Sequence, residues 1–139
     1  MEHPYPLHLD LTGKRVLVVG AGPVAVRRAR AATAAGGAVG VVALSAPDDL
    51  GLPVVLRAFE PSDVDGAWLV LSCTGTVDAE VATACRERRV WCVRADDASA
   101  SDAWVPAVGR AGDVVVSVTS GRDPRRSKAL RDGFVESLG

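Results

Sequence analysis

A glycine-rich loop is the first group of residues whose spacing points to chemistry. The segment Gly20-Ala21-Gly22-Pro23-Val24-Ala25 has the pattern G-x-G-x-x-A. In dinucleotide-binding folds the first Gly permits a tight turn, the second lets the backbone approach a pyrophosphate, and a small third residue allows close helix–sheet packing. The helix that opens there directs free N–H groups at the anion. We expect Gly20 and Gly22 to bind a pyrophosphate; a glycine turn without a ligand is the alternative.

The end of the second predicted strand lacks the acidic residue that usually binds the ribose hydroxyls. It reads Val42-Ala43-Leu44-Ser45-Ala46, so the adenosine ribose would meet backbone groups and the Ser45 hydroxyl. Asp48 and Asp49 follow late, and we interpret them as part of a solvated loop. Since neither Arg nor Lys stands there to bind a 2′-phosphate, we expect NAD rather than NADP.

The turn after the fourth predicted strand should also face the cofactor. It reads Ser72-Cys73-Thr74-Gly75-Thr76, and ligands of open α/β sheets bind beyond the carboxyl ends of the strands. We expect Thr74 to contact the cofactor and Thr76 to cap the next helix. We interpret Cys73 as a buried, inert thiol.

A carboxylate just past the fifth predicted strand is the candidate catalytic base. Asp96 follows this strand at the edge where a nicotinamide should lie. A free Asp has a pKa of about 3.9 and is a weak base at neutral pH, so we expect burial or the neighbouring Asp97 to raise the pKa of Asp96. The alternative is a solvated loop carboxylate or turn former. Asp102 is either a second carboxylate of the pocket or a cap at the start of a strand.

These side chains need a sheet whose parallel strands end at one edge. Apolar runs predict five strands, at Arg15–Val19, Val39–Leu44, Val54–Ala58, Trp68–Cys73 and Trp91–Arg94. Two helices, Pro23–Ala35 and one from about Val77 to Arg89, alternate with them. Strands alternating with helices at this spacing predict an α/β fold with a Rossmann-like parallel sheet.

The alternation stops after residue 103, so we expect a Rossmann-like domain over 1–103 and a separate element over 104–139. Trp104–Val108 and Val114–Val118 predict a β-hairpin, followed by a helix that Asp123 caps and Pro124 begins. Leu130, Phe134 and Leu138 are its predicted buried stripe. Because a hairpin and one helix make a poor core, we expect them to pack against a second copy in a homodimer. The alternative is that the hairpin folds back on its own sheet.

Composition excludes several classes of protein. The chain has 139 residues, 48% apolar and 24% charged, with a net charge of −1, which is unlike a disordered or a dedicated nucleic-acid-binding protein. No apolar run approaches the roughly 18 residues of a membrane span, and Met1–Pro4 does not open a secretory signal. Cys73, Cys85 and Cys92 contain no C-x-x-C pair, and the two histidines lack metal-ligand spacing. We expect a cytoplasmic protein without a preformed metal site.

Several segments, in order along nearly the whole chain, resemble one family. They are Tyr5–Leu11, Gly13–Gly20, Val24–Arg30, Val93–Asp97, Trp104–Ala107 and Val116–Gly121. Together they resemble precorrin-2 dehydrogenases, the dehydrogenase and often ferrochelatase module of sirohaem synthases. The resemblance implies NAD-dependent oxidation of precorrin-2 to sirohydrochlorin on a Rossmann domain with a dimerisation hairpin, with ferrochelation as a possible second activity.

The resemblance also implies roles for individual residues. It places dinucleotide contacts on Gly22, Pro23, Val24, Leu44 and Ser45. It makes Asp96 the aspartate linked to catalysis, and it places the Ser120 hydroxyl beside the tetrapyrrole pocket.

A tetrapyrrole with many carboxylates favours a cationic rim. Five arginines gather in the hairpin turn and the last helix: Arg110, Arg122, Arg125, Arg126 and Arg131. We expect this cluster, with Arg110 in the hairpin turn, to bind substrate. A solvated charged helix face is the alternative.

Two other functions stay open. A dinucleotide-sensing regulatory domain, such as those that control potassium transport, has a similar size and glycine loop. Such a sensor should carry the ribose-binding acid that this chain lacks, and it has no need of Asp96 and Ser120. The other alternative is a dimeric scaffold that has lost its activity.

Overall fold

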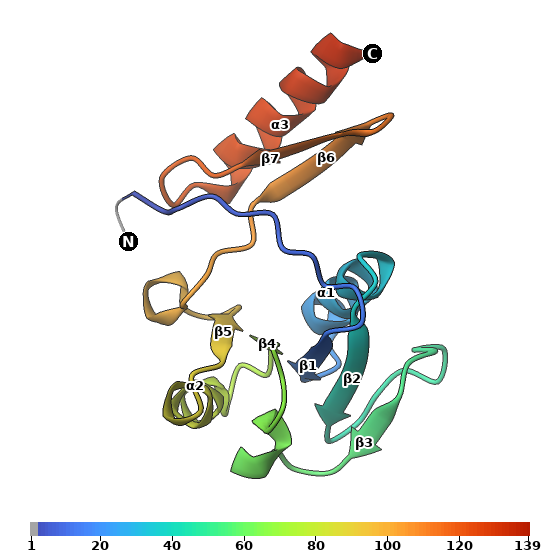
Figure 1. Cartoon of the computed structure of the whole chain (residues 1–139), viewed down its shortest axis with the longest axis vertical. Helices are drawn as coiled ribbons and strands as arrows, with labels where there is room; N and C mark the ends of the chain where they lie inside the picture. Colours follow the sequence, from blue (N-terminus) through green and yellow to red (C-terminus); the bar gives the residue numbers. More distant parts are fainter. Residues whose placement is uncertain (1–2) are drawn as a thin grey trace. The chain divides into compact units, whose positions relative to one another are not determined.

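The computed structural model describes residues 3–139. The chain divides into two compact units, one spanning Tyr5–Trp104 and the other containing Val105–Gly139 (Figure 1). The sequence analysis set this boundary after residue 103. No helix among the described residues is long and apolar enough to cross a membrane.

The first unit is built on a five-stranded sheet. Its strands are β1 (Arg15–Val19), β2 (Ala38–Ala43), β3 (Val54–Leu56), β4 (Leu69–Ser72) and β5 (Trp91–Arg94). All neighbours pair in parallel, in the order β3-β2-β1-β4-β5. This order is that of a dinucleotide-binding sheet, with its switch point between β1 and β4. The predicted Rossmann-like α/β fold is therefore confirmed.

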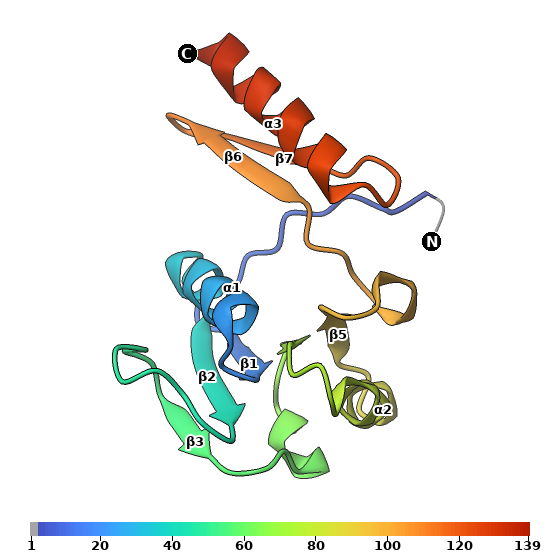
Figure 2. The same ribbon diagram turned by 180° about the vertical axis from the view of Figure 1, so that it is seen from behind.

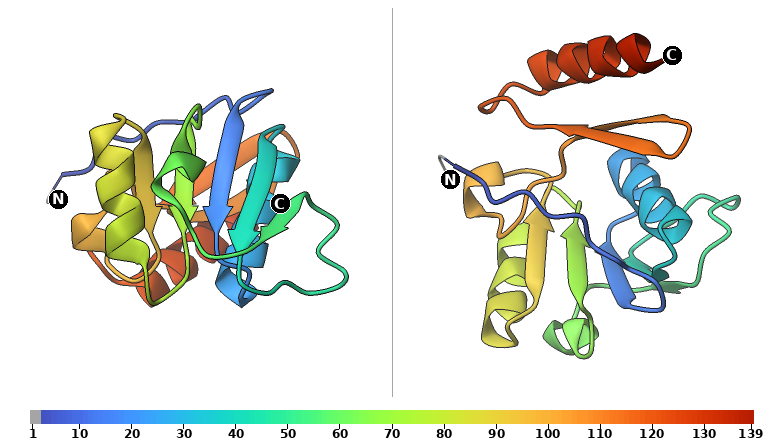
Figure 3. Two further views of the ribbon diagram at one scale, coloured as in Figure 1. Left: turned by 90° about the horizontal axis from the view of Figure 1, so that it is seen from below. Right: turned by 45° about the horizontal axis from the view of Figure 1, so that its top comes forward.

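Two helices cover opposite faces of this sheet, as Figure 3 (left) shows. The helix α1 (Pro23–Ala34) packs on one face through Ala25, Ala29 and Ala32. On the other face lie α2 (Asp78–Glu87) and the short 3-10 helix η1 (Pro61–Val64). A second 3-10 helix, η2 (Ala98–Ala100), follows β5. Small alanines on α1 and valines on the strands allow close packing, so both faces of the sheet are buried.

The second unit is a hairpin with a helix along it, as seen in Figure 2. The strands β6 (Ala107–Ala111) and β7 (Val114–Val118) pair antiparallel, and α3 (Pro124–Leu138) packs against both. The first strand begins later than predicted, at Ala107, and extends further, to Ala111, so the turn is shorter than predicted. Ala111 pairs with Val114, and Gly112, with φ +60°, opens the two-residue turn, as tight hairpins favour.

In the single chain, the predicted stripe of α3 is exposed rather than buried. Leu130, Phe134 and Leu138 are 37%, 52% and 55% exposed. The helix instead turns Val135 toward the hairpin, where a Cβ on Gly109 would lie only 2.6 Å from the Val135 Cγ2 atom. Since Gly109 has no side chain, α3 approaches this strand closely with the neighbouring face of the helix. The apolar stripe of Leu130, Phe134 and Leu138, called the α3 stripe below, is left exposed.

Candidate functional site

The glycine loop closes tightly over the end of β1. Gly20 has φ +106°, and a Cβ there would lie 2.5 Å from the carbonyl oxygen of Cys73. The Gly20 N–H also donates to the Val42 carbonyl at 2.8 Å, which ties the loop to the end of β2. Only glycine combines this backbone conformation with this close approach.

The same loop leaves the start of α1 open. Gly22 is the N-cap residue and supplies no side-chain cap, Pro23 takes the first turn, and this turn holds no acidic residue. A Cβ on Gly22 would meet nothing within 4 Å. Free N–H groups beside open space, with no carboxylate to compete, fit the pyrophosphate of a dinucleotide. Gly20, Gly22, Pro23 and Val24 are the residues that would hold it.

The end of β2 presents the two residues expected to lie near the adenosine ribose. β2 ends at Ala43, Leu44 is 79% exposed, and Ser45 is also exposed. Neither side chain carries a charge. This position can therefore meet a ribose through the Ser45 hydroxyl and backbone groups.

The strand register places the loops after β1, β4 and β5 at one edge. Val19 pairs with Ser72, and Ser72 pairs with Arg94. The loops after them therefore leave side by side, and the Ala95 N–H donates to the Ser72 carbonyl at 2.9 Å. The structure thus brings the glycine loop, Thr74 and Asp96 to the same edge of the first unit.

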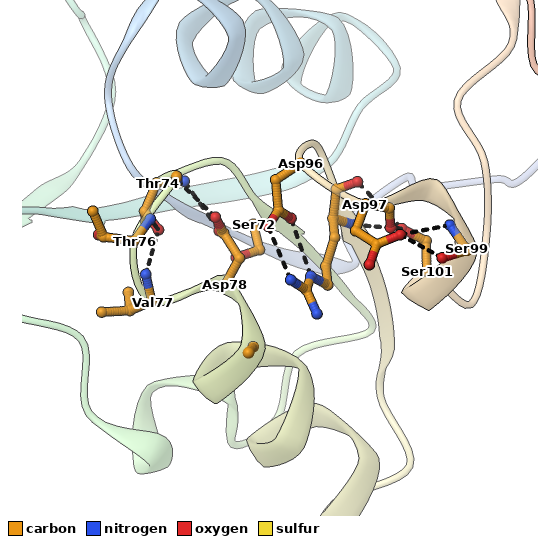
Figure 4. Close-up of polar contacts among 12 residues, drawn as sticks. Ser72, Thr74, Thr76, Val77, Asp78, Asp96, Asp97, Ser99 and Ser101 are labelled. Carbon is orange, nitrogen blue, oxygen red and sulfur yellow. Dashed lines mark hydrogen bonds and ion pairs between the residues drawn. The ribbon is translucent and has the colours of Figure 1, made fainter.

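The loop after β4 is held by an aspartate that the sequence analysis missed. Asp78 is only 2% exposed and accepts hydrogen bonds from the Ser72 hydroxyl and from the N–H groups of Thr74 at 3.0 Å and Gly75 at 2.7 Å (Figure 4). Its position four residues after Thr74, at the first residue of α2, was the available signal. Asp78 fixes the shape of the loop that carries Thr74.

Thr74 also uses its hydroxyl within this loop. The Thr74 Oγ1 atom accepts from the N–H groups of Thr76 at 3.1 Å and Val77 at 3.0 Å. The expectation that Thr76 caps the helix is wrong, because α2 begins at Asp78 with Val77 as its N-cap residue. Thr74 is thus held at the cofactor edge with its own backbone N–H directed at Asp78.

Asp96 is paired with an arginine of β5. The Nε and Nη2 atoms of Arg94 donate to the two carboxylate oxygens at 3.0 and 2.9 Å (Figure 4). The Asp96 side chain is 38% exposed and that of Arg94 is 15% exposed. These hydrogen bonds lower the pKa of Asp96 below its usual value. The expected raised pKa is therefore wrong: the hydrogen bonding from Arg94 outweighs desolvation.

The two other carboxylates after β5 have local partners. The Asp97 Oδ1 atom accepts from the Ser99 N–H at 3.0 Å and so caps η2, which lowers the pKa of Asp97, with the Ser99 hydroxyl as the largest cause. The Asp102 Oδ2 atom accepts from the Cys92 N–H at 3.0 Å, and the Asp102 N–H donates to the Cys92 carbonyl at 2.9 Å. Asp102 thereby closes the outer edge of β5, and its role toward substrate stays a prediction.

The remaining predicted substrate residues lie in the second unit. The Ser120 Oγ atom lies 2.8 Å from the Ser127 Oγ atom, and the Ser120 N–H donates to it at 3.0 Å. Arg110 is exposed. Arg131, by contrast, donates to the Val108 carbonyl at 3.2 Å and to Asp132 at 2.8 Å. One member of the predicted cationic rim is thus used inside its own unit.

Cys73 is the remaining nucleophile near this edge. Burial raises the pKa of the Cys73 thiol, which keeps it protonated and weakly nucleophilic. Among residues 3–139, no group of three or more His, Cys, Asp or Glu side chains is placed to hold a metal ion.

Comparisons with known proteins agree with the resemblance drawn from the sequence. The chain is 32% identical over 127 residues to a siroheme synthase of Pseudomonas fluorescens (strain SBW25), a match covering 85% of this chain and 27% of the relative. A siroheme synthase of Citrobacter koseri is 32% identical over 148 residues, covering 99% and 32%. The chain therefore spans about a third of the length of these relatives.

A solved structure of SirC, a precorrin-2 dehydrogenase, has the same fold. It superposes with a TM-score of 0.82 at 23% identity, covering 98% of this chain and 72% of that one. A family model described as putative NAD(P)-binding matches residues 7–107. Since this match includes the sheet, both covering helices and every residue of the candidate dinucleotide site, the chain belongs to this putative NAD(P)-binding family.

Proposed function

We propose that this chain is an NAD-dependent precorrin-2 dehydrogenase that forms sirohydrochlorin and acts as a cytoplasmic homodimer. One observation carries the proposal: the register of β1, β4 and β5 brings the glycine loop and the Asp96 carboxylate to one edge of the sheet. The likeness to siroheme synthases supplies the class of substrate. The odd number of cysteines, with no C-x-x-C pair, supports a reducing compartment.

Different elements would hold the pyrophosphate and the adenosine ribose of the dinucleotide. Gly22 and Val24 offer backbone N–H groups to the pyrophosphate, Gly20 and Pro23 shape the turn that presents them, and Leu44 and Ser45 lie at the ribose end. When bound, NAD supplies the hydride acceptor for the removal of two hydrogens from precorrin-2. Thr74, fixed by Asp78, lines the edge between the loop and Asp96.

Asp96 would accept the proton that leaves with the hydride. Because Arg94 lowers its pKa, Asp96 is ionised at neutral pH and can receive a proton without first losing one. The same low pKa makes it a weak base, so it must pass the proton quickly to water. Its 38% exposed side chain allows this transfer.

The second unit carries two side chains that can hydrogen-bond to a substrate. Ser120 and the exposed Arg110 can donate hydrogen bonds to substrate carboxylates, and Arg–carboxylate pairs are strong when both nitrogens engage. The α3 stripe is the surface that we assign to the second copy of the chain, because large apolar side chains on one helix face favour burial in an interface.

The test is NADH formation, followed by absorbance, when precorrin-2 is added to the chain with NAD. Asp96→Ala should lose about 10²–10⁴ in turnover, the contribution of a positioned base, while the Kd for NAD stays unchanged. Asp48→Ala, which removes an exposed loop carboxylate, is the matched control and should keep full turnover. Wild-type turnover in Asp96→Ala would remove Asp96 from the mechanism. Dinucleotide binding without turnover by the wild type would favour the sensor.

A further inference from the structure

An arginine follows β3 directly beside the ribose end of the candidate dinucleotide site. The Arg57 N–H donates to the carbonyl of Ala43 at 3.0 Å, and Ala43 is the last residue of β2. Leu44 and Ser45, the residues assigned to the ribose, come next in the chain. A guanidinium on this neighbouring backbone is the kind of group that binds the 2′-phosphate of NADP. Its presence contrasts with the uncharged end of β2.

The Arg57 guanidinium is held by an aspartate of η1. Its Nη1 and Nη2 atoms donate to the two carboxylate oxygens of Asp63 at 2.8 and 2.6 Å, and Nη1 also donates to the Ala58 carbonyl at 3.0 Å. An arginine uses these terminal nitrogens when it binds a phosphate through two hydrogen bonds. They are occupied by a group of the chain itself.

Asp63 is the fixed member of this pair. Its side chain is 8% exposed, against 38% for Arg57, and its Oδ2 atom also accepts from the Glu60 N–H at 2.8 Å. The hydrogen bond from Arg57 is the largest of the causes that lower the pKa of Asp63, so the carboxylate stays charged at neutral pH. A second acid, Glu60, lies farther from the guanidinium, at 3.8 Å.

We propose that Asp63 determines the choice of cofactor by keeping Arg57 away from the ribose, so that the chain binds NAD in preference to NADP. A 2′-phosphate would have to displace a buried carboxylate that the helix η1 already holds in place. Removing the charge of Asp63 frees the guanidinium for the phosphate. This inference rests on the dinucleotide binding in the proposed function, and it does not depend on the reaction or on Asp96.

The experiment measures the Kd values of NAD and NADP by isothermal titration calorimetry for the full chain. Asp63→Asn keeps an oxygen acceptor for the Glu60 N–H and removes the charge. It should tighten NADP binding by about tenfold or more, as expected for a new charge-assisted pair, and leave the Kd for NAD nearly unchanged. Glu60→Gln removes one negative charge from the same segment without freeing Arg57, so it should give no such gain.

Two further variants identify Arg57 as the source of the gain. Arg57→Gln alone should leave both Kd values nearly unchanged, because the wild-type guanidinium does not reach the ribose. In the double variant Asp63→Asn/Arg57→Gln the gain in NADP binding should disappear. Should Asp63→Asn fail to fold by circular dichroism, Arg57→Gln still decides: weaker NADP binding would show that Arg57 already contacts the phosphate and would overturn the inference.

The remaining outcomes separate the inference from the proposed function. A wild type that binds NAD, with an Asp63→Asn variant that gains no NADP affinity, overturns the role of Asp63 alone. An equal gain in Glu60→Gln does the same, since net charge would then explain it. A wild type that binds neither dinucleotide overturns both the inference and the proposed function.

Discussion

The two compact units of this chain hold themselves together in different ways. In Tyr5–Trp104, valines of β1 and β4 such as Val16 and Val70 are completely buried between two helical layers. In Val105–Gly139, Ser127 is the one buried residue, and Phe134 and Leu138 are more than half exposed. The first unit has a core of its own, whereas the second is held by hairpin hydrogen bonds and the close approach of α3 at Gly109. Its apolar side chains therefore need another surface.

The largest expected effect is on the free energy of unfolding, when a leucine of the first unit is replaced by alanine and compared with the same replacement in the second unit. Leu17→Ala removes a side chain that is 2% exposed and should lower the free energy of unfolding by about 2–5 kcal/mol, the usual cost of a cavity in a packed core. Leu138→Ala, at a position 55% exposed, should change it by about 0.5 kcal/mol or less in the monomer. Urea unfolding at low protein concentration measures both values. Equal losses would contradict the comparison.

Disrupting the α3 stripe should break assembly rather than folding. Phe134→Asp places a charge at the centre of the stripe, between Leu130 and Leu138, and should raise the Kd of the dimer by about 100-fold or more, as for a central interface residue. The far-ultraviolet circular dichroism should stay unchanged. Sedimentation equilibrium measures the Kd.

Ala129→Asp is the matched control for this variant. It adds the same charge to α3 at an exposed position outside the stripe, and the dimer should persist. A wild-type chain that is monomeric at all concentrations would overturn the proposed homodimer and leave the stripe without its assigned cover.

The main features of the first unit could be predicted from the sequence because they depend on residues that are neighbours in the chain. The apolar run at Arg15–Val19, the glycine loop and the start of α1 at Pro23 all follow from short-range signals. In the second unit the cap of α3 was predicted correctly as well: Asp123 accepts from the Arg126 N–H at 3.0 Å. Backbone conformation and capping depend on neighbours in the sequence, which a reader of the sequence can see.

The missed features depend on contacts between elements. Asp78 looks like an ordinary acidic residue in a first helical turn, and only the return of the loop after β4 buries it. Periodicity showed that Leu130, Phe134 and Leu138 share one side of α3, but the missing side chain of Gly109 decided which side faces the hairpin. The pair Arg94 and Asp96 has the spacing of two residues found in a strand, but it extends past the end of β5 at Arg94, where that spacing no longer predicts which side chains meet.

The smallest expected effect is on the pKa of Asp96, at the edge of the first unit where the loops after β1, β4 and β5 lie. Arg94→Gln keeps a hydrogen-bond donor and removes the charge, so the pKa of Asp96 should rise toward the free value of about 3.9. Carbon-13 NMR of the side-chain carboxyl measures this pKa directly. Because the folded pKa lies below the unfolded one, the stabilisation from this pair is present above the unfolded pKa and is lost as the pH falls through the folded pKa. The stability difference between wild type and variant should therefore vanish in acid.

The control is Arg110→Gln in the second unit, which should leave the titration of Asp96 unchanged. If Arg94→Gln also leaves the pKa of Asp96 unchanged, Arg94 does not lower that pKa. The side chains at the polar edge of the first unit would then be less ordered before ligand binding than the buried core beneath them.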